Sequence, residues 1–300
     1  MIITLNSGEL NFTTFWNTTE LLRVMLFVDG SSNIYEWSGA TTTFASATVN
    51  TLTKEGTTTW AQEGFYVSTA NRSISILCND GQIHTATYTG GETTTTLTGV
   101  SFDFTSVTPA TGEVIYQTVR TTANTSMTGI LATFSNDLIS TLNNQIWVAS
   151  LESQNVYLSK LNSYTDYSFS TPRTPGEGNL FNLDESLVGF LPQEDKMYAT
   201  TDENLWYEIS FTLSADLTNE DISVQRLKTN VLQGALSQAF IGHDKNNVVY
   251  VSHEPVLLSL GRVDNILVTP QLTDLSWPII NLMNTLDFTD GSVKYHKNFI

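Results

Sequence analysis

Short apolar runs that end in polar turns recur along the chain, and they predict β-strands. The run "LLRVMLFVDG" at 21–30 ends in Asp-Gly, and "NIYEWSG" follows at 33–39, which is the pattern of a β-hairpin. Threonine, aromatic and β-branched residues dominate later runs such as 73–91, with glycine at the turns. Residues 133–144 and 272–286 could form short helices, although Pro278 interrupts the second.

One unit, a polar turn followed by a short strand centred on an aromatic residue, occurs four times. The first three copies are each followed by a second apolar run, at 155–161, 204–211 and 255–263. Paired strands that recur about every 40 to 50 residues are typical of β-propeller blades, and we favour this architecture over a β-sandwich. The aromatic residues are Trp147, Tyr198, Tyr250 and Tyr295, so the intervals are 51, 52 and 45 residues.

The pattern predicts an all-β chain of propeller-like blades with an inserted small β domain. Residues 1–39 would supply the first propeller strands, because the hairpin at 24–39 matches the repeating unit. Residues 40–112 are rich in threonine and glycine and would form the insertion, after which "GEVIYQTVRT" leads back to the propeller. Residues 113–300 would form blades.

The last blade is expected to be incomplete within residues 113–300. Tyr295 has its turn and its strand, but no second apolar run follows it. Unpaired backbone groups need a partner strand. The N-terminal strands at 2–15, a longer polypeptide or another chain could supply that strand.

Charge narrows the classes of function. The chain of 300 residues carries 30 acidic and 13 basic residues, a net charge of −17, and only 14% of its residues are charged. Such a chain repels duplex nucleic acid, and no basic cluster offers sequence-specific binding to it. A single cysteine, Cys78, excludes an internal disulfide and is expected to be buried. We also expect no signal peptide and no membrane span, because no apolar segment approaches the roughly 18 residues required.

Candidate chemistry is sparse. The four histidines have no metal-ligand spacing, and no nucleophile, phosphate-binding or dinucleotide motif is present. Acidic pairs at 194–195, 202–203 and 220–221 could serve a propeller glycosidase, but they fall in predicted hairpin turns, where such residues are common. We therefore expect no catalytic, metal or cofactor site and no enzyme activity.

The least regular long stretch, residues 163–190, holds the residues that we assign to subunit contact. It would connect one blade to the next, and it combines aromatic side chains with an arginine, a combination common at protein interfaces. The alternatives are a crossover pinned by its own aromatic residues and, less favoured, a ligand-binding surface. The candidate residues are Tyr164, Tyr167, Phe169 and Arg173.

The order of these motifs resembles that of the β-propeller tail hub or nozzle proteins of tailed bacteriophages. The shared pattern is an aromatic strand, a "VY-x-S" strand, a "D-(Y/F)-S" segment, and an apolar run with aspartate that opens the next blade. The resemblance covers about residues 22–298. Its motifs here are Trp147, 156–159, 166–168, Asp184 and 197–209.

The resemblance implies a structural protein of the virion tail that is made in the host cytoplasm. Such proteins form a ring, commonly of six copies, around the DNA channel, and other tail proteins are their partners. DNA would pass through the lumen, and an acidic lumen would not grip it. The alternative is a receptor- or glycan-binding propeller module at the tail tip.

Overall fold

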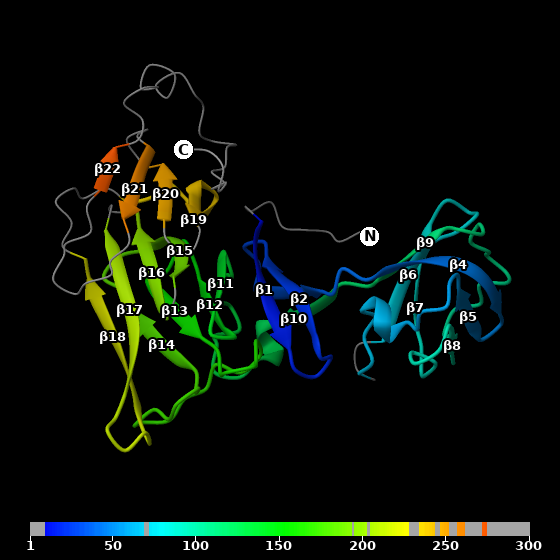
Figure 1. Ribbon diagram of the computed structural model, residues 1–300, viewed down its shortest axis with the longest axis horizontal. Helices are drawn as coiled ribbons and strands as arrows, with labels where there is room; N and C mark the ends of the chain where they lie inside the picture. Colours follow the sequence, from blue (N-terminus) through cyan, green and yellow to red (C-terminus); the bar gives the residue numbers. More distant parts are fainter. Residues whose placement is uncertain are drawn as a thin grey trace. The chain divides into compact units, whose positions relative to one another are not determined.

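The computed structural model describes residues 10–68, 72–193, 195–202, 205–227, 234–243, 247–251, 257–261 and 272–274. These residues form β-strands joined by turns, with three single turns of 3-10 helix (Figure 1). The helical turns are η1 (Ala61–Glu63), η2 (Asn124–Ser126) and η3 (Gln238–Phe240). The chain divides into two compact units. Among the described residues the first comprises 13–27 and 34–122, and the second comprises the rest.

The second unit contains three four-stranded antiparallel sheets, and in each the strands follow one another in chain order (Figure 1). This is the form of a propeller blade, so the predicted fold class is confirmed. The strands of the first two sheets are β11 (Leu138–Leu142), β12 (Gln145–Ala149), β13 (Asn155–Leu158), β14 (Asn179–Asn182), β15 (Leu187–Gln193), β16 (Lys196–Thr201), β17 (Trp206–Leu213) and β18 (Glu220–Arg226). Those of the third are β19 (Ile241–His243), β20 (Asn247–Val251), β21 (Leu257–Gly261) and β22 (Leu272–Asp274).

The repeat predicted from the sequence corresponds to the two middle strands of each sheet. Trp147, Tyr198 and Tyr250 lie in β12, β16 and β20, and the second apolar runs form β13, β17 and β21. The prediction for Tyr295 lies outside the described residues. The first and fourth strands were not predicted. β19 and β22 have three residues each, and β18 carries many polar residues. β11 lies in a segment predicted as a helix, and the apolar β15 begins inside the stretch 163–190, which was expected to connect two blades.

Two helix predictions are wrong where the structure describes them. Residues 138–142 form strand β11 instead, and β22 occupies 272–274, while the rest of 272–286 lies outside the described residues. Asn143 and Asn144 both have positive φ, 52° and 57°, and Leu142 pairs with Gln145 across them. Two such residues form the tight turn that matches the twist of a β-hairpin, so "NN" is a turn signal.

An apolar core joins the first two sheets of the second unit. Trp147 lies at its centre, and its ring centroid is 5.5 Å from that of Phe181, 6.3 Å from that of Phe190 and 5.9 Å from that of Phe211. A separate cluster that includes Tyr198 and Tyr250 joins the sheets of β16 and β20. Each of the three sheets therefore buries at least one face against a neighbouring sheet.

The first unit contains most of a four-stranded sheet and a complete six-stranded sheet. The four-stranded sheet has the order β1-β2-β3-β10, and the β2–β3 hairpin confirms the predicted one. Its strands are β1 (Asn11–Asn17), β2 (Leu22–Val28), β3 (Asn33–Trp37) and β10 (Arg120–Ala123).

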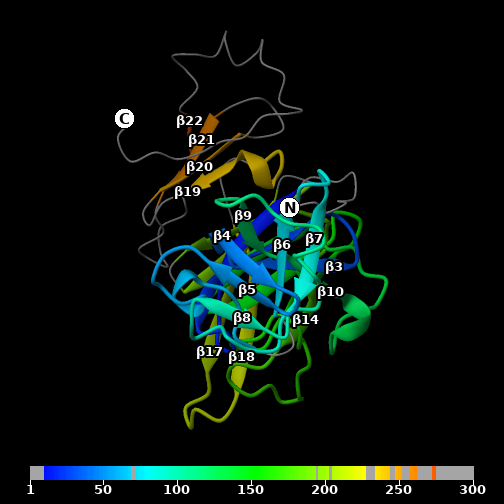
Figure 2. The same cartoon turned by 90° about the vertical axis from the view of Figure 1, so that its right-hand side faces the viewer.

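The six-stranded sheet, with the order β7-β6-β9-β4-β5-β8, lies between β3 and β10 in the sequence (Figure 2). Its strands are β4 (Thr41–Thr48), β5 (Thr51–Lys54), β6 (Ser73–Leu77), β7 (Ile83–Thr87), β8 (Thr96–Thr98) and β9 (Val114–Gln117). The chain thus leaves the first sheet after β3 and returns in β10, inside the segment "GEVIYQTVRT". The predicted domain limits at 39/40 and 112/113 stay a prediction.

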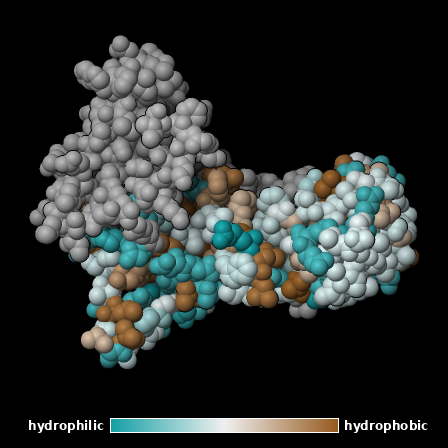
Figure 3. Space-filling view, in the orientation of Figure 1, coloured by the Kyte–Doolittle hydropathy of each residue, from teal (hydrophilic) through white to brown (hydrophobic). Residues whose placement is uncertain are grey.

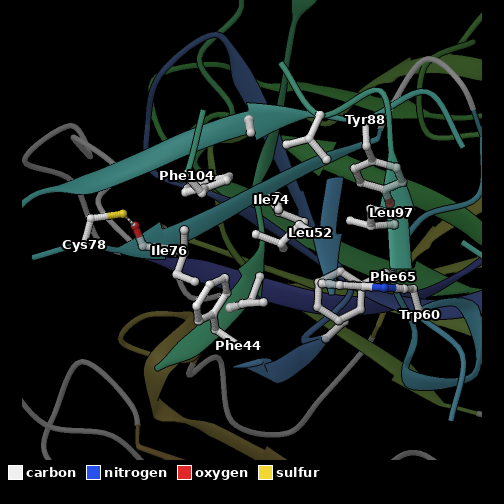
Figure 4. Packing of buried hydrophobic residues seen from close by; sticks show 14 residues of the cluster. Phe44, Leu52, Trp60, Phe65, Ile74, Ile76, Cys78, Tyr88, Leu97 and Phe104 are labelled. Atoms are coloured by element: carbon white, nitrogen blue, oxygen red, sulfur yellow. Dashed lines mark hydrogen bonds between the residues drawn. The ribbon is translucent and has the colours of Figure 1, made fainter. Parts of the chain in front are cut away.

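A dense apolar core fills one side of the six-stranded sheet (Figure 4). Trp60 and Phe65 meet edge to face with their ring centroids 4.8 Å apart, and Leu52 is fully buried among these residues. Cys78, 5% exposed, lies at the margin, so its predicted burial is confirmed. Burial of the thiol, with smaller contributions from Asp80 and Glu113, raises the pKa of Cys78 to about 11.

Leu52→Ala should destabilise the first unit by about 3 kcal/mol, because it removes a buried side chain and leaves a cavity. Val49→Ala is the matched control, since Val49 is 67% exposed, and it should change the unfolding free energy by less than about 0.5 kcal/mol. Urea denaturation followed by tryptophan fluorescence measures both. Equal losses for the two variants would contradict the core described here.

Candidate functional site: the loop between β13 and β14

The loop at 159–178 carries all four residues predicted to contact another subunit. It does not cross to the next blade, as the sequence suggested. Instead it returns to the same sheet, because β14 pairs with β13 from Asn155↔Asn182 to Leu158↔Asn179. The crossover prediction was wrong because it treated two strands as a complete blade.

Two tyrosines of the loop point into the protein. Tyr167 is fully buried, and its ring packs edge to face on Tyr157 with the centroids 6.2 Å apart. Tyr164 is 5% exposed. Burial strongly raises the pKa of the Tyr167 hydroxyl, so this group stays neutral. The aromatic residues therefore pin the loop, as in the alternative that the sequence left open, but they pin it to its own blade and not as a crossover.

Close backbone contacts hold Tyr167 in place. Its amide donates to the carbonyl of Thr128 at 2.7 Å. A Cβ at Gly178 would lie 2.5 Å from the carbonyl carbon and oxygen of Tyr167, and one at Gly129 would lie 2.6 Å from the same carbonyl carbon. These two positions require glycine because the chain segments touch there.

Arg173 is buried, and it connects the loop to the next blade. Its guanidinium donates to the carbonyls of Gly178 and Glu177 and pairs with the carboxylate of Glu220 at the start of β18. It also lies over the ring of Phe211 in β17, 5.6 Å from the centroid. The backbone reinforces this junction, since the amide of Glu220 donates to the carbonyl of Arg173 at 2.9 Å.

The carboxylates of Glu177 and Asp166 hold the rest of the loop through hydrogen bonds. Glu177 accepts hydrogen bonds from the hydroxyl and amide of Ser170 and from the amide of Thr174, and these bonds lower its pKa from 4.5 to about 2. At Asp166, partial burial raises the pKa, but bonds from Ser168 and the ammonium of Lys160 outweigh it, so the pKa lies below its usual value. These two carboxylates are thus engaged within the chain.

Phe169 is the candidate that faces solvent, with 46% of its surface exposed. The sequence grouped it with three residues that turn out to be interior. The role of all four in subunit contact stays a prediction, but Phe169 presents a side chain suited to it. Sequence reasoning missed Glu220 as the partner of Arg173, because 220–221 were placed in a turn, whereas they open strand β18.

The other side chains that could support catalysis or metal binding do not form a site in the described residues. His84 pairs with Asp80 at 2.8 Å and stacks on Phe102. In the described part of the chain, no group of three His, Cys, Asp or Glu residues could hold a metal ion, and no helix is long and apolar enough to cross a membrane.

Comparisons with known proteins give faint likenesses. No family model matches the chain, and no curated protein matches it. Among solved structures, human WBSCR16 matches with a TM-score of 0.38 and 11% identity over 92% of this chain, and yeast RCC1 (Prp20), in its complex with Kap60, with 0.33 and 13% over 85%. The chain spans 55% and 56% of these two proteins. Similarity at this level carries no functional argument.

Arg173→Met should destabilise the protein by about 3 kcal/mol, because it leaves the Glu220 carboxylate without its partner in a largely desolvated place. Glu220→Gln should cost less when Arg173 is already replaced, so the two effects should be non-additive. Lys160→Met is the control, since its pair with Asp166 is about one third exposed and should contribute less than about 1 kcal/mol. Urea denaturation of the wild type, the two single variants and the double variant measures the coupling between Arg173 and Glu220. Additive losses of unfolding free energy would contradict the junction.

The protein should lose stability as the pH falls from about 4.5 to about 2, in part through Glu177. The folded pKa lies below the usual value, so the stabilisation is complete above pH 4.5 and disappears as the carboxylate is protonated in the folded state. Glu177→Gln should therefore lower the melting temperature at pH 7 but make it less sensitive to acid. Thermal unfolding of the wild type and of Glu177→Gln, at pH 7 and at the acid end of this range, tests the prediction. An equal fall in melting temperature for the two proteins would refute it.

Proposed function

We propose that the chain is a structural component of a bacteriophage virion tail, of the hub or nozzle type, which assembles as a ring around the DNA channel. Its role is structural and not catalytic: it packs against its partners, which are copies of itself and other tail proteins. The β-propeller-like blades of the chain are compatible with such a module.

The observation that carries the proposal is where the resembling motifs lie. In sequence order they occupy strand β12 (Trp147), strand β13 with the residue after it (156–159), the loop (166–168), the connection between β14 and β15 (Asp184), and the strands β16 and β17 of the next blade (197–209). The motifs therefore fall on successive strands and connections of one blade and its neighbour. A likeness in short motifs has more weight when the motifs correspond to successive structural parts.

Charge supports the same proposal. A net charge of −17 would let a ring lumen pass DNA without gripping it. A ligand-binding surface built on the aromatic residues of the loop is not favoured, because Tyr164 and Tyr167 are buried and cannot meet a ligand. A receptor- or glycan-binding propeller module that uses another surface stays the alternative.

The purified chain should form a closed oligomer of one discrete size, and Phe169→Lys should shift it toward the monomer without changing the melting temperature. A charge at an interface centre opposes burial, whereas the same charge in solvent costs little. Leu151→Lys is the control, because Leu151 is also an exposed apolar residue, at 43%. Native mass spectrometry measures the sizes.

A wild-type chain that stays monomeric at all concentrations would overturn the ring. A ring that Phe169→Lys leaves intact would remove Phe169 from the contact but not the ring itself.

A further inference from the structure

Hydroxyl groups cover one face of strands β4, β5 and β8. Directly paired residues of antiparallel strands lie on the same face, and here the pairs form two rows across the three strands. Ser46 pairs with Thr53 and Thr53 with Thr96, while Thr48 pairs with Thr51 and Thr51 with Thr98. We call these six residues, Ser46, Thr48, Thr51, Thr53, Thr96 and Thr98, the hydroxyl face.

The alternation of β5 fixes this face outward. Leu52 and Lys54 point into the core, so Thr51 and Thr53 point away from it. The six side chains are exposed or partly exposed. The surface over these strands is mostly white in Figure 3, the colour of residues that are neither strongly apolar nor charged.

A shallow hollow of about 500 Å³ continues the face at one end. Thr43 belongs to the same side of the sheet, because its hydroxyl donates to the carboxylate of Glu55, two residues after Thr53, at 2.9 Å. Thr41, Thr43 and Glu55 line the hollow. Tyr116 pairs with Thr41 and is half-buried, so it brings an aromatic ring to that side.

We propose that the hydroxyl face and the adjoining hollow bind a neutral, polyhydroxylated polymer, that is, an uncharged glycan chain. The hydroxyls of Thr48 and Thr51 are hydrogen-bonded to each other at 2.7 Å, and those of Thr53 and Thr96 at 2.9 Å. One hydroxyl of each pair therefore keeps its proton for a ligand, and all of them can still accept hydrogen bonds, as sugar hydroxyls can. Neighbouring side chains within a row are about 4.8 Å apart, the spacing between strands, and the two rows are about 6.8 Å apart along the strands. The face therefore offers a regular series of contacts to an extended chain. Glu55, an exposed carboxylate with several acceptor positions, can take further donors.

The charges of the site favour a neutral polymer over an anionic one. Glu55 and Glu63 both line the hollow, and the chain as a whole is strongly acidic, so a sulfated or phosphorylated polymer would be repelled. Glu63 is held by Lys54 at 2.7 Å. Burial raises its pKa, but the bonds from Lys54 and Thr58 outweigh this, and the pKa lies below normal. A glycosidase acid needs a raised pKa, so the arrangement suits binding and not hydrolysis.

This site goes beyond the proposed function and does not rest on it, since the hydroxyl face belongs to the first unit and requires no ring. Native gel electrophoresis in gels that contain dextran, mannan or hydroxyethylcellulose tests it. At least one of these neutral polymers should retard the protein, while dextran sulfate should not. The double variant Thr51→Val with Thr53→Val should bind about tenfold more weakly, because two hydrogen-bonding groups are lost.

Thr87→Val on β7 is the matched control. Thr87 is an exposed threonine of the same six-stranded sheet, on the strand at the opposite edge from β8, and its replacement should leave retardation unchanged. Urea denaturation confirms that each variant is folded. Absence of retardation in all three neutral polymers, equal retardation in dextran sulfate, or full retardation of the folded double variant would each overturn the proposal. Oligomer size, measured separately, reports on the ring.

Discussion

The contact on which much of the second unit depends is the packing of Trp147 between two sheets. A four-stranded sheet has two faces and cannot bury either by itself, so its stability comes from neighbours. The Trp147 ring meets Phe181 of its own blade and both Phe190 and Phe211 of the next. Phe211 in turn lies beneath Arg173. A continuous series of contacts thus connects the buried indole of Trp147 to the ion pair of Arg173 and Glu220, which holds the loop.

Turn chemistry accounts for a good part of the unusual composition. An aspartate accepts a hydrogen bond from the amide two residues later in the sequences starting at Asp29, Asp80, Asp103, Asp166 and Asp216. Such bonds fix turns locally, without a basic partner. Acidic residues and hydroxyls can therefore accumulate while lysine and arginine stay scarce. The "D-(Y/F)-S" motif at 166–168 belongs to this group, so this part of the phage-tail likeness also has a structural role in turn formation.

The sequence predicted those features that depend on local pattern. Trp147 and Tyr198 were placed correctly in strands, because an apolar strand after a polar turn is a local signal. The insertion between β3 and β10 was predicted from a local signal too, the high threonine and glycine content of that segment. The fourth strands were not predicted: β14, for example, has an alternating, half-polar pattern, and it exists because β13 offers it backbone partners. Pairing between distant segments is not encoded in the pattern of either segment alone.

The candidate site shows the same limit at the level of single residues. Tyr167 and Phe169 are both aromatic and only two positions apart, yet one is fully buried and the other is half exposed. What separates them is the close approach of Gly129 and Gly178 to the backbone of Tyr167, which requires neighbours 38 and 11 residues away along the chain. Similarly, Arg173 looked suitable for a partner chain because its own partner, Glu220, lies 47 residues further on. Residues that resemble an interface in sequence can be the internal contacts of a repeat, since blade packing and subunit packing use the same side chains.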